Sequence, residues 1–148
     1  SERYCFNERG EMQTGLQSLK QADGSFASYY FGDDGVMRTG KQTIYNDDLE
    51  ENQIWYFQTK GSLKGQGYHG ERDNQVYVNG LLKKADPELR YEPVSTGEKR
   101  YLVNTSGTIQ KATSSSSSAS RPELGKGFKD IKDSNDTVWT VDTSGIIQ

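Results

Sequence analysis

Apolar and aromatic residues recur along this chain in a short motif with the alternation of an extended strand. The clearest copy runs from Tyr29 to Met37: an aromatic residue, any residue and a Phe, then three turn-forming residues, Gly35, and an apolar residue two positions later. Because side chains alternate along a strand, Tyr29 and Phe31 share one face and Tyr30 lies on the other. A Gly at this place suits a hairpin turn, so the motif predicts a strand, a turn and a return strand.

The motif occurs six times, and each copy has an apolar anchor where the clearest copy has Phe31. The anchors are Phe6, Phe31, Phe57, Val78, Val103 and Val141, at spacings of 25, 26, 21, 25 and 38 residues. Five copies predict hairpin turns at Gly10, Gly35, Gly61, Gly107 and Gly145. The remaining copy, Val76–Leu82, is short and degenerate, and its Asn79-Gly80 pair is typical of a two-residue hairpin turn.

This repetition predicts an all-β fold, a solenoid of stacked β-hairpin repeats. A single hairpin is only marginally stable in water. Stacked hairpins bury one another's aromatic faces in series, which lets a chain poor in aliphatic residues fold.

A serine-rich stretch interrupts the series and accounts for its long last spacing. Residues 1–112 are expected to form a body of five copies, the fourth of them degenerate. Residues 113–126 have the composition of a flexible linker or loop. Residues 127–148 are expected to form a sixth hairpin repeat.

The composition agrees with a fold of thin layers that has few aliphatic residues, and it excludes several classes of protein. Leu, Ile, Val and Phe account for 27 of the 148 residues, against 9 Tyr, 2 Trp and 16 Gly. A net charge of −3 and a pI of about 5.2 disfavour a nucleic-acid partner, and no apolar run approaches the ~20 residues that membrane insertion needs. One Cys and one His leave little for a metal site or a catalytic triad. The sequence therefore predicts a non-enzyme with no cofactor, no metal and no catalytic residue.

Two runs of the chain resemble a known group of bacterial repeats. The runs Tyr29–Ile44 and Tyr4–Gln17, with their Thr-Gly pairs after the hairpin, look like cell-wall-binding repeats. That superfamily includes choline-binding modules, the glucan-binding repeats of glucosyltransferases and the repetitive oligopeptide regions of clostridial toxins. The resemblance covers about two thirds of the chain and is strongest in the first three copies.

The resemblance implies a hairpin solenoid on a secreted or surface protein of a Gram-positive bacterium, extracellular or associated with the cell wall. It implies non-covalent attachment to a cell-wall polymer or polysaccharide, or to choline, and a further domain elsewhere in the parent chain. Choline-binding repeats place an aromatic residue directly after the Thr-Gly pair, and here Leu16 and Lys41 stand there. A Lys in a cage wall would repel a trimethylammonium group. The glucan-binding and toxin types therefore fit better, with Phe128 as one cage-like exception.

The leading prediction is a glycan-binding module whose aromatic side chains stack on sugar rings. Tyr30 and Tyr56 are the first candidates because they lie opposite the Phe anchors. The further candidates are Tyr29, Trp55, Tyr68, Tyr77, Tyr101, Phe128 and Trp139. Each of them can also serve as core packing. Two other functions stay open: a structural spacer or protein-adhesion solenoid without a saccharide site, and a choline-binding module with degenerate cages.

Overall fold

The computed structural model describes residues 2–148 as an all-β protein in two compact units. Unit 1 comprises Ser1–His69 and Tyr77–Leu82, and unit 2 comprises Gly70–Val76 and Lys83–Gln148. All paired strands are antiparallel. The helical structure in residues 2–148 is a single 3-10 turn, η1, at Pro122–Leu124. No helix in the described part of the chain has the length and apolarity to cross a membrane.

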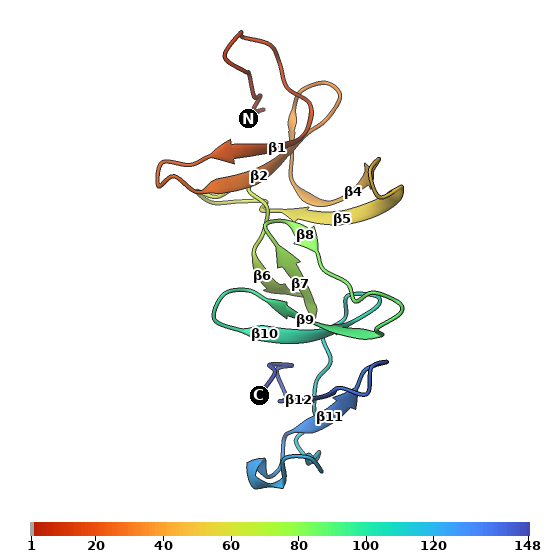
Figure 1. The fold of residues 1–148 in the computed structure, drawn as a ribbon. Helices are drawn as coiled ribbons and strands as arrows, with labels where there is room; N and C mark the ends of the chain where they lie inside the picture. The colour runs from red at the N-terminus through yellow and green to blue at the C-terminus, as the bar shows by residue number, and fades with distance from the viewer. Residues whose placement is uncertain (1) are drawn as a thin grey trace. The chain divides into compact units, whose positions relative to one another are not determined.

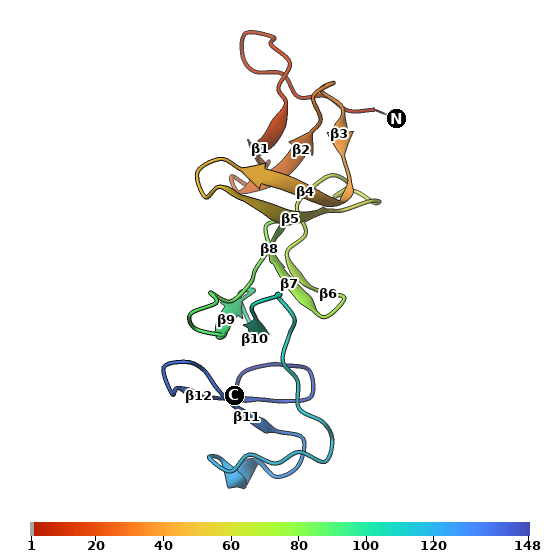
Figure 2. The ribbon, with the colours of Figure 1, turned by 90° about the vertical axis from the view of Figure 1, so that its right-hand side faces the viewer.

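Unit 1 contains two hairpin systems, which Figure 1 and Figure 2 show beside each other in red to yellow. The first has the order β1-β2-β3, with strands at Gly15–Lys20, Phe26–Phe31 and Met37–Arg38. In the second, β4 (Gly40–Asn46) pairs with β5 (Glu51–Phe57) along its whole length. Strand β8 (Leu81–Leu82) pairs with β5 and with the Tyr77–Val78 end of β7 (Gln75–Val78).

Unit 2 repeats the plan with shorter strands. Strands β9 (Tyr91–Ser95) and β10 (Arg100–Asn104) form one hairpin, and β11 (Lys129–Lys132) and β12 (Val138–Val141) form another. Strand β6 (Gly70–Arg72) also belongs to this unit. Leu102, Ile131 and Val141 form its buried cluster, with Tyr91, Trp139 and Ile147 packed against it.

The predicted anchors and turns are confirmed in four of the five Gly copies. Each anchor pairs with the apolar residue two positions beyond the turn Gly: Phe6 with Met12, Phe31 with Met37, Val103 with Ile109 and Val141 with Ile147. The amide of the turn Gly donates in each case to the carbonyl oxygen of the residue after the anchor. The Asn79-Gly80 turn is also confirmed, because Val78 pairs with Leu81 across it.

A side chain next to the anchor explains why these turns close so tightly. In three copies this residue is Asn7, Asn104 or Asp142, and its side-chain oxygen accepts two backbone N–H groups of the turn. Asn and Asp favour this local bonding, which replaces water at the turn amides. The turn is therefore specified by the Asn or Asp as well as by the Gly.

The third copy departs from the prediction. Phe57 pairs with Gly67, not with Leu63, and Leu63 is 47% exposed. Gly65 takes the place expected for Gly61, because its amide donates to the carbonyl oxygen of Gln58. The loop is four residues longer than in the other copies, and the prediction of a closing turn at Gly61 is wrong.

Successive hairpins pack through one recurring contact, in which an apolar side chain of one copy lies on the turn Gly of the next. A Cβ added to Gly35 would lie 2.2 Å from Met12 Sδ, and one added to Gly65 would lie 2.3 Å from Met37 Sδ. In unit 2, a Cβ at Gly145 would lie 2.2 Å from Ile109 Cγ2. The missing Cβ at each Gly is therefore the space that the preceding hairpin fills.

The serine-rich segment is tied to the last hairpin by the half-buried carboxylate of Asp130. Ser118 is buried, and its hydroxyl donates to Asp130 Oδ1. The amide of Ser120 (2.9 Å) and the hydroxyl of Thr140 (3.0 Å) also donate to this carboxylate. Burial alone would raise the pKa of Asp130, but these hydrogen bonds outweigh it and lower the pKa to about 2. The division of the chain at residues 113–126 stays a prediction.

Substitution of a stacked Gly should destabilise its unit more than substitution of an open one. Gly145→Ala should lower the free energy of unfolding of unit 2 by about 2–4 kcal/mol, because left-handed strain and overpacking against Ile109 add together. Gly10, the equivalent turn Gly of the first copy, has a similar φ of 78° and open space at its Cβ, so Gly10→Ala should cost unit 1 only about 1–2 kcal/mol of strain. Urea unfolding measures both, and equal losses would contradict the stacking contact.

Acid should loosen the last hairpin through Asp130. Because the pKa of Asp130 is lower in the folded chain than its ordinary value of 3.8, the ionised carboxylate stabilises the fold fully at pH values above 3.8. This stabilisation is lost as the pH falls toward about 2. Asp130→Asn should lower the free energy of unfolding at pH 7 by about 1.5–3 kcal/mol and flatten its dependence on pH between 4 and 2. Asp136→Asn, at an exposed turn, is the matched control. Equal pH profiles for the two variants would contradict the role of Asp130.

Candidate functional site

The predicted aromatic candidates of unit 1 fall into two packed groups. Tyr30 and Trp55 both stack on the Phe57 ring, at centroid distances of 6.1 and 6.0 Å. Tyr56, Tyr68 and Tyr77 form a second group. Tyr29 is half-buried on β2, opposite Gln17.

The tyrosine group has the geometry of rings in direct contact. Its three centroid distances lie between 6.0 and 6.3 Å, two of them between edge-to-face rings. Aromatic pairs in protein cores adopt these separations, and Tyr77 is buried. The three rings therefore contact one another as aromatic side chains in a core do.

The candidates of unit 2 are held in separate places. Tyr101 is buried, and Phe128 is half-buried. The Trp139 indole N–H donates to Asp133 Oδ2 (3.0 Å), which lowers the pKa of that carboxyl, and Arg100 lies over the ring. These three aromatic side chains line neither of the hollows described below, and their role as ligand contacts stays a prediction.

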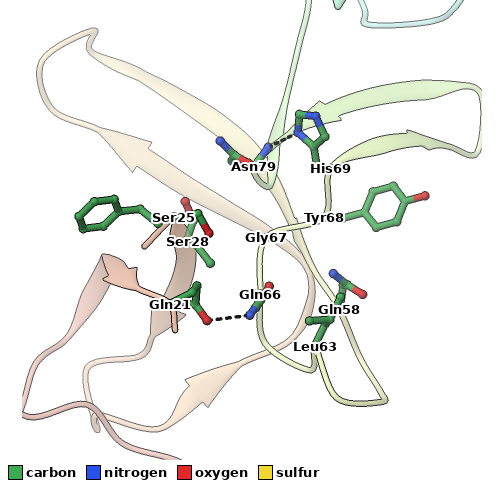
Figure 3. Close-up of a pocket in the computed structure, with 12 residues that line it drawn as sticks. Gln21, Ser25, Ser28, Gln58, Leu63, Gln66, Gly67, Tyr68, His69 and Asn79 are labelled. Carbon is green, nitrogen blue, oxygen red and sulfur yellow. Dashed lines mark hydrogen bonds between the residues drawn. The ribbon is translucent and has the colours of Figure 1, made fainter. Parts of the chain in front are cut away.

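An open groove in unit 1, drawn in Figure 3, collects uncharged polar side chains. Its volume is about 480 Å³. The lining residues come from the end of β1, the start of β2, the long loop of the third copy and the β7–β8 turn. They are Gln21, Ser25, Phe26, Ala27, Ser28, Gln58, Leu63, Gln66, Gly67, Tyr68, His69 and Asn79.

The long loop of the third copy builds one wall of this groove. The amide of Gly67 donates to the carbonyl oxygen of Ser28 (2.8 Å), which fixes the loop against β2. Gly67 also passes close to the β7–β8 turn, since a Cβ there would lie 2.4 Å from the Asn79 carbonyl oxygen. Any larger residue would push the loop away from the turn. Gly67 is therefore required for the wall to stand where it does.

Hydrogen bonds hold several of the lining side chains in place. Gln66 Nε2 donates to Gln21 Oε1 (3.1 Å), and Gln21 Nε2 donates in turn to the Leu19 carbonyl oxygen (2.8 Å). The backbone N–H of Asn79 donates to His69 Nδ1 (3.2 Å). The Gln66–Gln21 and Asn79–His69 hydrogen bonds are drawn as dashed lines in Figure 3. The groove is therefore set before any ligand arrives.

The groove offers amides, hydroxyls and apolar surface without fixed charge. No Asp, Glu, Lys or Arg is among the residues of the described chain that line it. Phe26 is 62% exposed at its edge. Figure 3 shows the Tyr68 ring directed away from Gln21 and Ser28. The arrangement suits a neutral ligand with many hydroxyl groups.

Sequence reasoning found only Tyr68 of this groove. The amides of Gln21, Gln58 and Gln66 were not predicted, because amide residues do not follow the hydrophobic alternation. Phe26 carried a usable signal, since it is an aromatic residue directly after the Asp23–Ser25 turn and outside the repeat motif. An aromatic residue that the stack does not need is a candidate for ligand contact.

A second hollow lies in unit 2 and has a different character. It has a volume of about 430 Å³ and is lined by Pro87, Arg90, Tyr91, Asn104 and Thr105. The Arg90 guanidinium lies over the Tyr91 ring, 5.7 Å from its centroid. Arg90 thereby covers one face of the Tyr91 ring. The groove of unit 1 is therefore the stronger candidate site.

The described residues offer no cluster of metal-ligating side chains and a single thiol. Residues 2–148 contain no group of three His, Cys, Asp or Glu side chains placed to hold a metal ion. Cys5 is a free, half-buried thiol in the first hairpin. The acidic turns at Asp33–Asp34 and Asp47–Asp48 are exposed.

No family model matches the chain. Over 106 residues it is 26% identical to the large tegument protein deneddylase of Murid herpesvirus 1 (strain K181). The match covers 72% of this chain and 5% of that protein. A match of this extent assigns no family.

Three solved structures are similar to the chain in fold. CbpJ from Streptococcus pneumoniae TIGR4 matches with a TM-score of 0.44 and 18% identity, over 99% of this chain and 45% of that one. Choline binding protein F from Streptococcus pneumoniae matches with a TM-score of 0.43 and 18% identity, over 98% of this chain and 43% of that one. CbpF in complex with ipratropium matches with a TM-score of 0.42 and 18% identity, over 98% of this chain and 42% of that one. The chain spans less than half the length of each, and at these scores the similarity carries no functional assignment.

Proposed function

We propose that this chain is a non-catalytic module that binds a neutral polysaccharide in the unit 1 groove and so attaches its parent protein to a cell-wall polymer. The observation that carries the proposal is the lining of the groove, which combines amides and hydroxyls with exposed apolar surface and lacks charge. The repeat resemblance supports an extracellular setting at a bacterial surface.

The amides supply the hydrogen bonds that fix sugar hydroxyls. An amide side chain offers both a donor and an acceptor, so it can bond a hydroxyl in either sense. Gln58 makes no side-chain hydrogen bond within the part of the chain that the structure describes. Its amide is therefore available to a ligand without breaking any contact of the fold.

Phe26 supplies the apolar face on which a sugar ring packs. Its side chain is mostly exposed and belongs to β2, so a rigid strand holds it. A pyranose ring presents C–H groups on one face and hydroxyls at its rim. Packing of the C–H face on Phe26 and hydrogen bonding of the rim to the amides are mutually compatible in one pose.

An open groove of this kind binds one sugar unit weakly, and a polymer compensates for that weakness. A repeating polysaccharide presents many equivalent units, and binding at one raises the local concentration of the next. Surface attachment needs long residence on a polymer more than tight binding of a single unit. The module therefore works without catalysis.

Choline is the competing ligand, and it requires a different surface. A trimethylammonium group binds over aromatic faces within about 6 Å of the ring centroids. The rings of Tyr56, Tyr68 and Tyr77 occupy one another's faces and edges. Amide-lined space offers little attraction to such a cation. A neutral glycan is therefore the function we favour.

Groove variants should lose glycan binding without losing stability. Phe26→Ala and Gln58→Leu should each weaken retention on an immobilised neutral glucan about tenfold, because a ring contact or a hydrogen-bond pair is worth roughly 1–1.5 kcal/mol. Affinity electrophoresis in gels containing dextran or a β-1,3-glucan measures this directly. Thermal unfolding should stay within 2 °C of the parent chain, because neither side chain is part of the core.

Tyr45→Ala is the matched control, since Tyr45 is an exposed aromatic residue of β4 that does not line the groove. It should bind like the parent chain. Equal weakening by Tyr45→Ala and Phe26→Ala would contradict the groove as the site. Retention on choline-substituted resin with no retention in either glucan would replace the proposed ligand by choline.

A further inference from the structure

The hollow of unit 2 carries a positive charge that no acidic side chain of its lining balances. Arg90 lines it, and no Asp or Glu is among the lining residues of the described chain. Arg90 forms no ion pair and no side-chain hydrogen bond within residues 2–148. Its guanidinium lies over the Tyr91 ring, a contact that uses the charge and needs no hydrogen-bond acceptor. The N–H donors of Arg90 are therefore left for a ligand.

A second donor in this hollow is left over by the turn beside it. Asn104 Oδ1 accepts the backbone N–H groups of Ser106 (3.0 Å) and Thr108 (2.9 Å), which fixes the end of the amide that faces the turn. The Nδ2 group makes no hydrogen bond within the described chain. In the first copy, the equivalent group of Asn7 donates to Glu11 Oε1 (3.0 Å). Thr108 stands at the place of that Glu and offers no carboxylate.

The pairing of β9 with β10 brings these donors to one face. Tyr91 and Asn104 lie directly opposite each other in the register, so their side chains project from the same face, with Cβ atoms about 5 Å apart. Arg90 reaches this face through its contact with the Tyr91 ring, at 5.7 Å from the centroid. Thr105 adds an exposed hydroxyl to the lining. The hollow thus collects a guanidinium, an amide NH2 group and a hydroxyl.

The acidic side chains nearest in the sequence do not line the hollow. Glu92 follows Tyr91 and lies on the other face of β9, and its Oε2 accepts the backbone N–H of Asp86 (2.7 Å). Asp86 Oδ1 accepts the backbone N–H of Glu88 (2.9 Å). Arg90 therefore sets the sign of the charge within the lining, which favours an anionic ligand.

We propose that the unit 2 hollow binds an oxyanion, the carboxylate or phosphate group of an acidic ligand. A guanidinium can donate to two oxygens of such a group at once, and the Asn104 amide can donate to another. The binding is weak, because water screens an exposed pair of charges. This inference is independent of the ligand in the unit 1 groove, whose lining carries no charge.

NMR titration of the full chain tests the proposal at constant pH and ionic strength. Glucuronate and inorganic phosphate are the anionic probes, and methyl glucoside is the neutral counterpart. The side-chain NH2 signals of Asn104 and the backbone N–H signal of Thr105 should shift saturably with at least one anion, with half-saturation in the millimolar range. The neutral sugar should leave both signals in place. The probe that binds more tightly identifies the preferred group as carboxylate or phosphate.

Two substitutions remove the expected anion contacts while keeping the elements of the fold. Arg90→Gln removes the charge and should raise the dissociation constant about fivefold. Asn104→Asp keeps an oxygen that can close the turn, as Asp142 does in the last copy, but it replaces the NH2 donor with a negative charge. It should raise the dissociation constant more than about tenfold. The Thr105 signal reports binding in both variants, and the remaining backbone signals report that each is folded.

Arg100→Gln is the matched control, because Arg100 also lies over an aromatic ring of unit 2, that of Trp139, and does not line the hollow. It removes the same charge and should bind both anions like the parent chain. Equal weakening by Arg100→Gln and Arg90→Gln would show that only the overall charge matters, and the site would be wrong. Shifts that fail to saturate with either anion, or that the neutral sugar reproduces, would overturn it as well.

Discussion

The structure depends on the seating of one apolar side chain on a glycine that has no Cβ. Met12 on Gly35, and Ile109 on Gly145, repeat the same geometry in two units. Each hairpin alone has too little apolar surface to be stable in water, so the contact supplies what the isolated element lacks. The glycine is needed twice over, for the direction of the turn and for the space above it. This double requirement explains why a chain with few aliphatic residues can still exclude water from Phe57 and Val141.

The anchors and most turns were predictable because they follow from local chemistry. Alternation identified Phe31 and Val103 as buried, and Asn79-Gly80 identified a two-residue turn, all of which the structure confirms. The third copy was mispredicted because Gly61 and Gly65 are both acceptable turn residues. The choice between them is decided by packing against Met37, which is distant in the sequence. A local pattern cannot express that preference.

The candidate site was less predictable than the fold for a related reason. Gln21, Gln58 and Asn79 come from three separate elements, and no spacing along the chain relates them. Aromatic residues were expected to mark the site, but the stack itself uses most of them, as Tyr30 on Phe57 shows. The proposed ligand contacts are drawn from the residues that the repeat leaves over. The signal in the sequence is therefore a departure from the motif rather than the motif.

The loop that follows Phe57 has a consequence for how such modules diversify. Where Asn7, Asn104 or Asp142 follows the anchor, its side chain closes the turn and nothing protrudes. Gln58 at that position is followed by a longer excursion, which becomes one wall of the groove. In the proposed function, recognition is assigned to a segment whose length can change while the seating of the hairpins stays the same. In this proposal, specificity can change between Gln58 and Gly65, provided that Gly65 and Gly67 keep their contacts with Met37 and Asn79, and each copy of the repeat is a separate place at which a new binding surface can arise.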